Sequence, residues 1–205
     1  HEVDRADRRR VLAAYQLQPG LDRLGRGREQ LLQVRLDAVL LEPGVLAELV
    51  GTAILIMAVV GSGIAAQGLT DDIGLQLLIN AISTVLALGV LITVFLPVSG
   101  AHFNPVVTAV LLVRRGLTAR LALAYVVAQI VGGALGTLLS HAMYARPLVS
   151  SFDGDRSEPG LWLGEVIATA GLILAVLLVS RDVVAIAVPA CIGAAYFFTL
   201  STSFA

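Results

Sequence analysis

Ser-Gly-Ala-His-Phe-Asn-Pro, residues 99–105, follows one long apolar segment and opens a second, shorter one that ends at Val113. From Asn104 this apolar stretch is only ten residues long. An α-helix needs about 20 residues to cross the roughly 30 Å of hydrocarbon in a bilayer, so the stretch is too short to do so. Asn is a preferred N-cap, and Pro suits the first helical position because its missing N–H has no helical partner there. The sequence therefore predicts a re-entrant half-helix that begins at Asn104 and Pro105.

The composition indicates that most of the chain lies in lipid. Of the 205 residues, 57% are hydrophobic and 14% are charged, and the mean hydropathy is +0.87. An average soluble domain is about half apolar and a quarter charged. No segment alternates polar with apolar residues, as the strands of a membrane barrel do. We therefore predict an all-α membrane protein with five transmembrane helices, at about 45–66, 75–97, 119–143, 161–180 and 183–201.

The basic residues in the connections predict the orientation, because cytoplasmic loops carry an excess of Lys and Arg. The connection at 114–120 contains three arginines, whereas the one around Asp71 and Asp72 contains no basic residue. Counting the crossings then places the N-terminus in the cytoplasm and the connection 144–160 outside. We expect a multi-pass protein of the cell membrane, embedded in lipid.

An internal repeat relates the first and fourth predicted spans. Glu48-Leu-Val-Gly-Thr52 resembles Glu165-Val-Ile-Ala-Thr169, and three crossings separate the copies, so the second copy enters the membrane from the opposite side. Inverted repeats of this kind put broken half-helices near the midplane of the membrane, where they face the permeating species. The half-helix after Asn104 fits that role.

Residues 99–105 also predict a pore lining. The N-terminus of a half-helix carries partial positive charge, and the Asn104 amide can donate to a passing water or hydroxyl. An extended segment before it would expose the carbonyls of Gly100, Ala101 and His102 as acceptors. Such a lining disfavours cations and suits small uncharged solutes. An isolated Asn-Pro is ordinarily only a turn or a helix cap, and the membrane context is what favours a pore.

These residues resemble the first signature of the major intrinsic proteins, the aquaporins and aquaglyceroporins. The signature reads Ser-Gly-Ala-His-X-Asn-Pro-Ala-Val-Thr, and residues 99–108 match it except at Val106. The resemblance covers about residues 45–205 and implies an inverted repeat of six membrane helices and two half-helices around one pore per subunit. It also implies a homotetramer, and it adds Pro105 and Val106 to the expected pore lining. We expect neither a cofactor nor a metal, because the spans show no metal-ligand cluster.

The family pattern places further residues by counting along the chain. The sequence ends at Ala205, just before the expected second Asn-Pro-Ala motif, so a second half-helix and a sixth span are missing from it. The resemblance implies a selectivity constriction at Thr84, Ala194 and Ser203, which are all small. The implied opening is wide and moderately polar, similar to that of bacterial members linked to arsenite or other metalloid hydroxides.

Ionisable residues inside the spans allow two interpretations. Burying a charge in a membrane is costly, which makes Glu48 and Glu165 candidates for a proton relay. The resemblance implies instead that both glutamates brace the half-helix loops by accepting hydrogen bonds from backbone N–H groups, and that His102 braces its own loop. Cys191 is a candidate ligand for soft metalloids or a buried structural cysteine.

The spans contain no nucleophile–base pair, metal-ligand cluster or phosphate loop. The glycines at 132, 133 and 136 indicate close helix packing instead. We therefore expect a passive channel for water or small uncharged solutes, glycerol-like or arsenite, and not an enzyme. The alternatives are an ion-coupled secondary transporter, which shares inverted repeats and broken helices, and a fragment without transport of its own.

Residues 1–44 differ from the rest of the chain. They contain 8 of the 14 basic and 7 of the 15 acidic residues, so this segment belongs in water. Its pattern is helical and amphipathic with a break at Pro19-Gly20. We predict a soluble helical segment at 1–44, of the kind that the tail of a fused domain would supply, joined to an incomplete channel domain at 45–205. Because its acids nearly balance its bases, we expect no nucleic-acid partner.

Overall fold

The computed structural model describes residues 42–149 and 158–199. The segment predicted at 1–44 lies outside the described residues up to Leu41, as does the end of the chain from Leu200. Within the described ranges six helices follow one another: α2 (Pro43–Leu69), α3 (Ile73–Phe95), α4 (Pro105–Val113), α5 (Ala119–Met143), α6 (Pro159–Leu178) and α7 (Val184–Phe198).

Local sequence signals determine where these helices begin. Pro43, Pro105 and Pro159 occupy the first turns of α2, α4 and α6, where a missing N–H costs no helical hydrogen bond. Asp72 caps α3, since its carboxylate accepts from the Leu75 N–H at 2.9 Å. The half-helix predicted from Asn104 is confirmed, because α4 begins directly after Asn104 and has nine residues.

Among the described residues four helices, α2, α3, α5 and α6, are long and apolar enough to cross a membrane. Their bounds lie within about three residues of the predicted spans. In the described residues α7 has 15 residues, or about 22 Å at 1.5 Å per residue, which is shorter than the hydrocarbon core. The fifth predicted span, 183–201, extends past Thr199, where the description ends. The prediction of an all-α, multi-pass membrane protein is confirmed.

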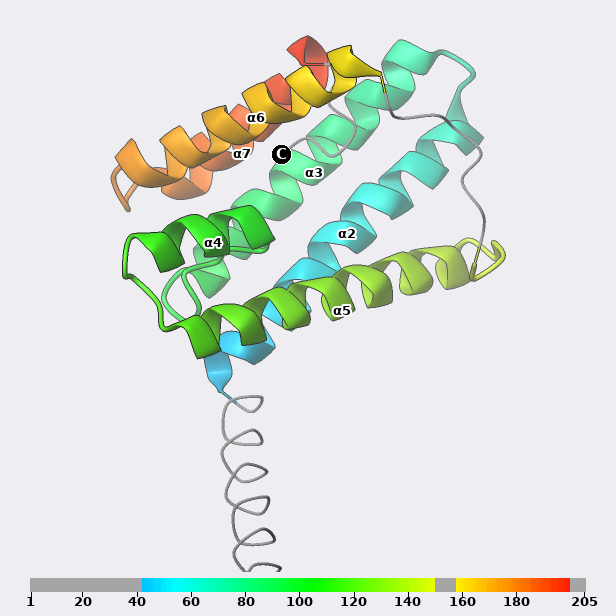
Figure 1. The fold of residues 1–205 in the computed structure, drawn as a ribbon. Coiled ribbons are helices and arrows are strands. Elements are labelled where there is room, and N and C mark those ends of the chain that lie inside the picture. The colour runs from blue at the N-terminus through cyan, green and yellow to red at the C-terminus, as the bar shows by residue number, and fades with distance from the viewer. Residues whose placement is uncertain (1–41, 150–157, 200–205) are drawn as a thin grey trace, which may run out of the picture. The chain divides into compact units, whose positions relative to one another are not determined.

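The helices form two packed groups that meet along α3 (Figure 1). Helix α2 lies against α5 on one side and α3 on the other, and α3 also packs against α7, which pairs with α6. The short α4 contacts α5 and α6. The chain between α3 and α4 is therefore enclosed by helices from both halves of the sequence.

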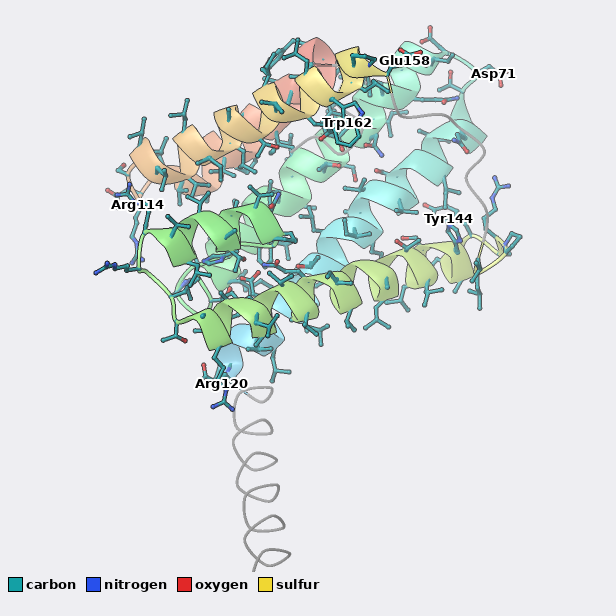
Figure 2. The ribbon with its side chains drawn as sticks, in the orientation of Figure 1. Asp71, Arg114, Arg120, Tyr144, Glu158 and Trp162 are labelled. Carbon is teal, nitrogen blue, oxygen red and sulfur yellow. The ribbon has the colours of Figure 1, made fainter. Side chains whose placement is uncertain are left out.

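The labelled side chains of Figure 2 identify the two ends of this bundle. Arg114 and Arg120 lie at one end, and Asp71, Tyr144 and Glu158 lie at the other. Helix α6 begins directly after Glu158, which is at the end where α2 finishes near Asp71. The helices that carry the two copies of the sequence repeat therefore run in opposite directions.

Glycines allow α2 and α5 to touch along their backbones. A Cβ atom at Gly132 would overlap the Leu49 carbonyl oxygen, and one at Gly136 would overlap the Ala53 carbonyl oxygen. One turn further along, the Ser140 hydroxyl donates to the Met57 carbonyl across the same interface at 3.1 Å. This is the small-residue packing that membrane helices use, because close backbone approach maximises dispersion contacts.

Candidate pore

The loop from Ser99 to Asn104 turns the chain from α3 into α4 through an unusual backbone. Gly100, Ala101 and Phe103 have φ angles of 89°, 52° and 47°. In this left-handed region a residue with a Cβ atom costs about 1–2 kcal/mol. The segment expected to be extended is therefore a compact turn, and such a turn needs other groups to hold it in place.

Glu48 of α2 supplies that hold from a fully buried position, with 0% of its surface exposed. One carboxylate oxygen accepts from the Ser99 hydroxyl at 2.6 Å and from the His102 N–H at 3.0 Å. The other accepts from the Phe103 N–H at 2.7 Å and from the Gln129 amide at 2.9 Å. A buried carboxylate is costly unless its oxygens are satisfied, and here four donors meet it. Two of the four are loop N–H groups.

A second layer of polar side chains surrounds this carboxylate. The Gln129 amide also donates to the Thr108 hydroxyl at 3.0 Å, and the same hydroxyl lies 3.0 Å from Nδ1 of His102. On the other side of the loop, the Tyr125 hydroxyl donates to the Ser99 carbonyl at 3.2 Å. The loop is thus tied to α2, α4 and α5 at once, and the Ser99 carbonyl is occupied by Tyr125.

The Asn104 side chain works as the cap of α4. Its carboxamide oxygen accepts from the N–H groups of Val106 at 2.7 Å and Val107 at 3.3 Å. These are two of the N–H groups that a helix start leaves without an intrahelical partner. Because the carboxamide oxygen faces the start of α4, the NH₂ group lies on the side of the amide away from these N–H groups. Asn104 lines the cavity described next.

A cavity of about 650 Å³ lies beside the loop and is lined by residues of α2, α3, α4, α6 and α7. At one end its wall contains Gly116, Leu117 and Arg181. The middle of its wall is aliphatic, with side chains from both halves of the chain: Leu55, Leu88, Ile92, Leu172, Val188 and Ile192. Thr84 and Tyr196 add two hydroxyl groups to the lining. In the described residues the cavity is therefore mostly apolar, with polar groups on the loop side, at Thr84 and Tyr196, and at Arg181.

Four of the predicted pore residues line this cavity: Gly100, Ala101, His102 and Asn104. The other two, Pro105 and Val106, are exposed and are not part of the lining. His102 is itself mostly buried, 8% exposed, because its ring packs edge-on against Tyr125 with 5.3 Å between the ring centroids. The half-helix therefore presents its cap to the cavity together with one face, formed by Val107 and Leu111.

The three residues of the predicted constriction fall in different places. Thr84 of α3 is buried and lines the cavity. Ala194 of α7 is exposed and is not part of the lining. Ser203 lies outside the described residues. Glu165, the repeat partner of Glu48, is half-buried on α6.

The structure adds residues that sequence reasoning missed. Tyr196 lines the cavity with its hydroxyl 2.9 Å from the Thr84 hydroxyl, and Gln129 and Thr108 join the loop network. Gln129 could have been predicted from the sequence, because a carboxamide inside an apolar span is costly without hydrogen-bond partners. Tyr196 lies among other aromatic residues near the end of the sequence, and no local sequence pattern distinguishes it from them.

Membrane helices, a half-helix capped by Asn104 and a cavity beside that cap are the features of a membrane transport protein built with broken helices. Residues 37–203 match the family described as Major intrinsic protein. The chain therefore belongs to the major intrinsic protein family, and the predicted resemblance is confirmed.

Individual relatives agree with this assignment. The chain is 46% identical over 162 residues to "Aquaglyceroporin AqpS" of Rhizobium meliloti, covering 78% of this chain and 70% of the relative. It is 36% identical over 140 residues to "Probable aquaporin TIP4-1" of Oryza sativa, covering 64% and 55%. It is 33% identical over 127 residues to "Aquaglyceroporin" of Toxoplasma gondii, covering 61% and 46%. The chain thus spans about half the length of the last two. These relatives support a passive channel for water and small solutes.

Proposed function

We propose that the complete protein is a passive channel for water and small uncharged solutes of the glycerol type, with arsenous acid as a further substrate, and that they pass through the 650 Å³ cavity. The name of the rhizobial relative supports a solute larger than water. The small side chain of Thr84, which lines the cavity, supports an opening wide enough for such a solute, with Ser203 as a further small member of the proposed constriction.

The charge pattern of the cavity carries this proposal. In the part of the chain that the structure describes, no acidic side chain lines the cavity, and Arg181 is its one charged residue. Glu48 is buried away from the cavity and is satisfied by four donors. An ion-coupled transporter would need titratable acids facing the path. The pattern therefore favours the channel over that alternative.

The loop residues have different roles along the proposed path. The N-terminus of α4 points its partial positive charge toward the cavity, which disfavours cations. The carbonyls of Gly100, Ala101 and His102 serve as acceptors for solute hydroxyls, and the Asn104 NH₂ group serves as a donor. Glu48 and Glu165 brace the two half-helix loops. The aliphatic wall opposite offers no competing hydrogen bonds, so a polar solute follows the loop.

We propose that the protein is a homotetramer of the cell membrane with a cytoplasmic N-terminus. Arg114 and Arg120 gather at one end of the bundle and Asp71 and Glu158 at the other (Figure 2), which supports a cytoplasmic position for the arginine end. Residues 1–44 would then be a soluble cytoplasmic segment ahead of the channel domain, 45–205. The aliphatic side chains exposed on the described helices suit both lipid and neighbouring subunits.

Stopped-flow swelling of proteoliposomes with glycerol, urea and arsenous acid tests the channel. We expect the complete protein to accelerate uptake of glycerol and arsenous acid over empty vesicles, without a requirement for a proton or sodium gradient. Acceleration of no solute would refute the channel, and gradient-dependent uptake would favour the transporter. The 205-residue chain measured alongside tests the interpretation of a fragment without transport of its own.

A matched pair of substitutions tests the path. Leu88→Trp places a bulky ring in the cavity wall, where Leu88 is 7% exposed, whereas Leu86→Trp places the same ring on the outer face of α3, where Leu86 is 65% exposed. We expect Leu88→Trp to suppress solute permeation and Leu86→Trp to leave it unchanged, at equal amounts of folded protein. Equal permeation by both variants would place the path elsewhere.

A further inference from the structure

We infer that Tyr196 of α7 is a selectivity-determining residue of this channel, and that it acts as a pair with Thr84. This inference deepens the proposed function and rests on it. Counting from the family pattern places only small residues at the constriction and does not select Tyr196. The tertiary structure instead puts an aromatic ring and a second hydroxyl beside Thr84.

The two side chains form one unit in the cavity wall. The Thr84 and Tyr196 hydroxyls lie 2.9 Å apart, within hydrogen-bond distance, across a sequence separation of 112 residues. Each residue is 4% exposed, and both line the cavity. A hydrogen bond at this depth has no competing bulk water, so it holds both side chains in one arrangement.

Helices α3 and α7 pack closely beside this pair. A Cβ atom at Gly193 would lie 2.7 Å from Cγ2 of Val85, the neighbour of Thr84. Further along the same interface, a Cβ atom at Gly89 would lie 3.2 Å from the Ala185 carbonyl oxygen. Helices α3 and α7 therefore approach each other closely at these two glycines. The Tyr196 ring therefore lies beside a closely packed helix interface.

The pair is also the polar end of an otherwise aliphatic wall. On α3 the lining residues are Thr84, Leu88 and Ile92, and on α7 they are Val184, Val188, Ile192 and Tyr196. Thr84 is 12 residues before Leu96, where the loop side of the cavity begins, which corresponds to about 18 Å of helix. A solute that leaves the loop carbonyls thus crosses aliphatic surface before it meets the two hydroxyls.

This position gives the ring and the hydroxyls separate effects on selectivity. The Tyr196 ring fills space that the small Thr84 side chain would leave open, so it limits the size of the solute. A hydroxyl has one hydrogen and two lone pairs, so Thr84 retains hydrogen-bonding capacity toward a solute while Tyr196 holds it in place. A polyol gives up more of its hydration in a narrow passage than water does, and it gains more from such a fixed polar site.

Four variants of the complete protein test the hydroxyl pair: Tyr196→Phe, Thr84→Val, and the matched controls Tyr144→Phe and Thr93→Val. Tyr144 is 42% exposed, and the Thr93 hydroxyl is exposed and bonds the Gly89 carbonyl of its own helix. We expect each pair variant to lower the ratio of glycerol to water permeability by about three- to tenfold, the effect of one lost hydrogen bond on a barrier. The controls should leave the ratio unchanged.

The double variant Tyr196→Phe/Thr84→Val separates a pair from two independent residues. Because either single change already removes the shared bond, the double variant should lower the ratio no further than the larger single effect. Additive effects, or unchanged ratios in both single variants of a conducting protein, would overturn the inference. If the unsubstituted protein conducts no solute, the proposed function itself fails, which is a different result.

A third measurement tests the ring alone. Tyr196→Ala should raise the ratio of five-carbon polyol to glycerol permeability by about tenfold, or 1.4 kcal/mol of barrier, whereas Tyr196→Phe keeps the ring and should leave this ratio unchanged. An unchanged ratio in a Tyr196→Ala protein that still conducts glycerol would overturn the steric part. If the alanine variant does not fold, Tyr196→Leu, which keeps an apolar side chain of intermediate size, tests the same steric effect.

Discussion

Glu48→Gln changes the centre of the loop network with almost no change in size. The carboxylate offers two acceptor oxygens to four donors, the Ser99 hydroxyl, the Gln129 amide and two loop N–H groups. Glutamine replaces one of those oxygens with an NH₂ donor. The effect of the substitution depends on which of the four donors can adapt to this NH₂ group.

Two donors can adapt and two cannot. The Ser99 hydroxyl can rotate to accept, and Gln129 can turn its amide over, since its oxygen is buried without a partner in the described structure. The N–H groups of His102 and Phe103 have no such freedom. Ser99 and His102 share one carboxylate oxygen, and Gln129 and Phe103 share the other. Either orientation of the new amide therefore leaves one loop N–H without an acceptor.

The one unsatisfied loop N–H sets the expected loss of stability. A buried donor left unsatisfied costs about 1–3 kcal/mol, and the remaining hydrogen bonds lose the strengthening that a charged acceptor provides. We therefore expect Glu48→Gln to lower the free energy of unfolding by about 2–4 kcal/mol. Solute permeability should fall as well, because Ala101 and Phe103 hold left-handed backbone angles that need the tether.

Denaturant titration of the purified protein in detergent, followed by circular dichroism, measures this loss. Glu42→Gln is the matched control, because Glu42 is exposed at the start of α2 and its side chain makes no capping hydrogen bond. The control should change stability by less than about 0.5 kcal/mol, as surface substitutions usually do. If Glu48→Gln is as stable as Glu42→Gln, the loop does not depend on this carboxylate and the reasoning is wrong.

Three further predictions concern helix packing, helix capping and backbone conformation. Gly136→Ala should destabilise by about 1–3 kcal/mol, since its Cβ would overlap a carbonyl of α2, whereas the same change at Gly133, with 3.8 Å to its nearest neighbour, should be tolerated; thermal unfolding of both variants in detergent checks this. Asn104→Ala should cost about 1 kcal/mol through the lost cap, and Asn104→Ser should recover most of it because Ser caps equally well, as denaturant midpoints will show. Gly100→Ala should cost about 1–2 kcal/mol, because Gly100 has a φ of 89°, and a variant as stable as the unsubstituted protein would contradict that angle.

Much of the fold was predictable because its signals are local. Hydropathy over about 20 residues gave the four long helices, and the Asn104-Pro105 pair gave the start of α4, since a cap depends on residues within one turn. The glycines at 132 and 136 indicated close packing but not the partner. That partner, α2, is a property of the assembled bundle. The expected extended loop was wrong in its backbone, because the left-handed angles of Ala101 and Phe103 are imposed by contacts from another helix.

The sequence by itself determined the solvent, the helices, the half-helix and the family of this protein, since each depends on a short stretch of residues or on a motif. Only the tertiary structure decided which side chains meet. Glu48 reaches the loop across more than 50 residues and Tyr196 reaches Thr84 across 112, and no local pattern contains such pairs. Hydrogen bonds are short and directional, so their partners depend on how the helices pack, and packing is a property of the whole chain.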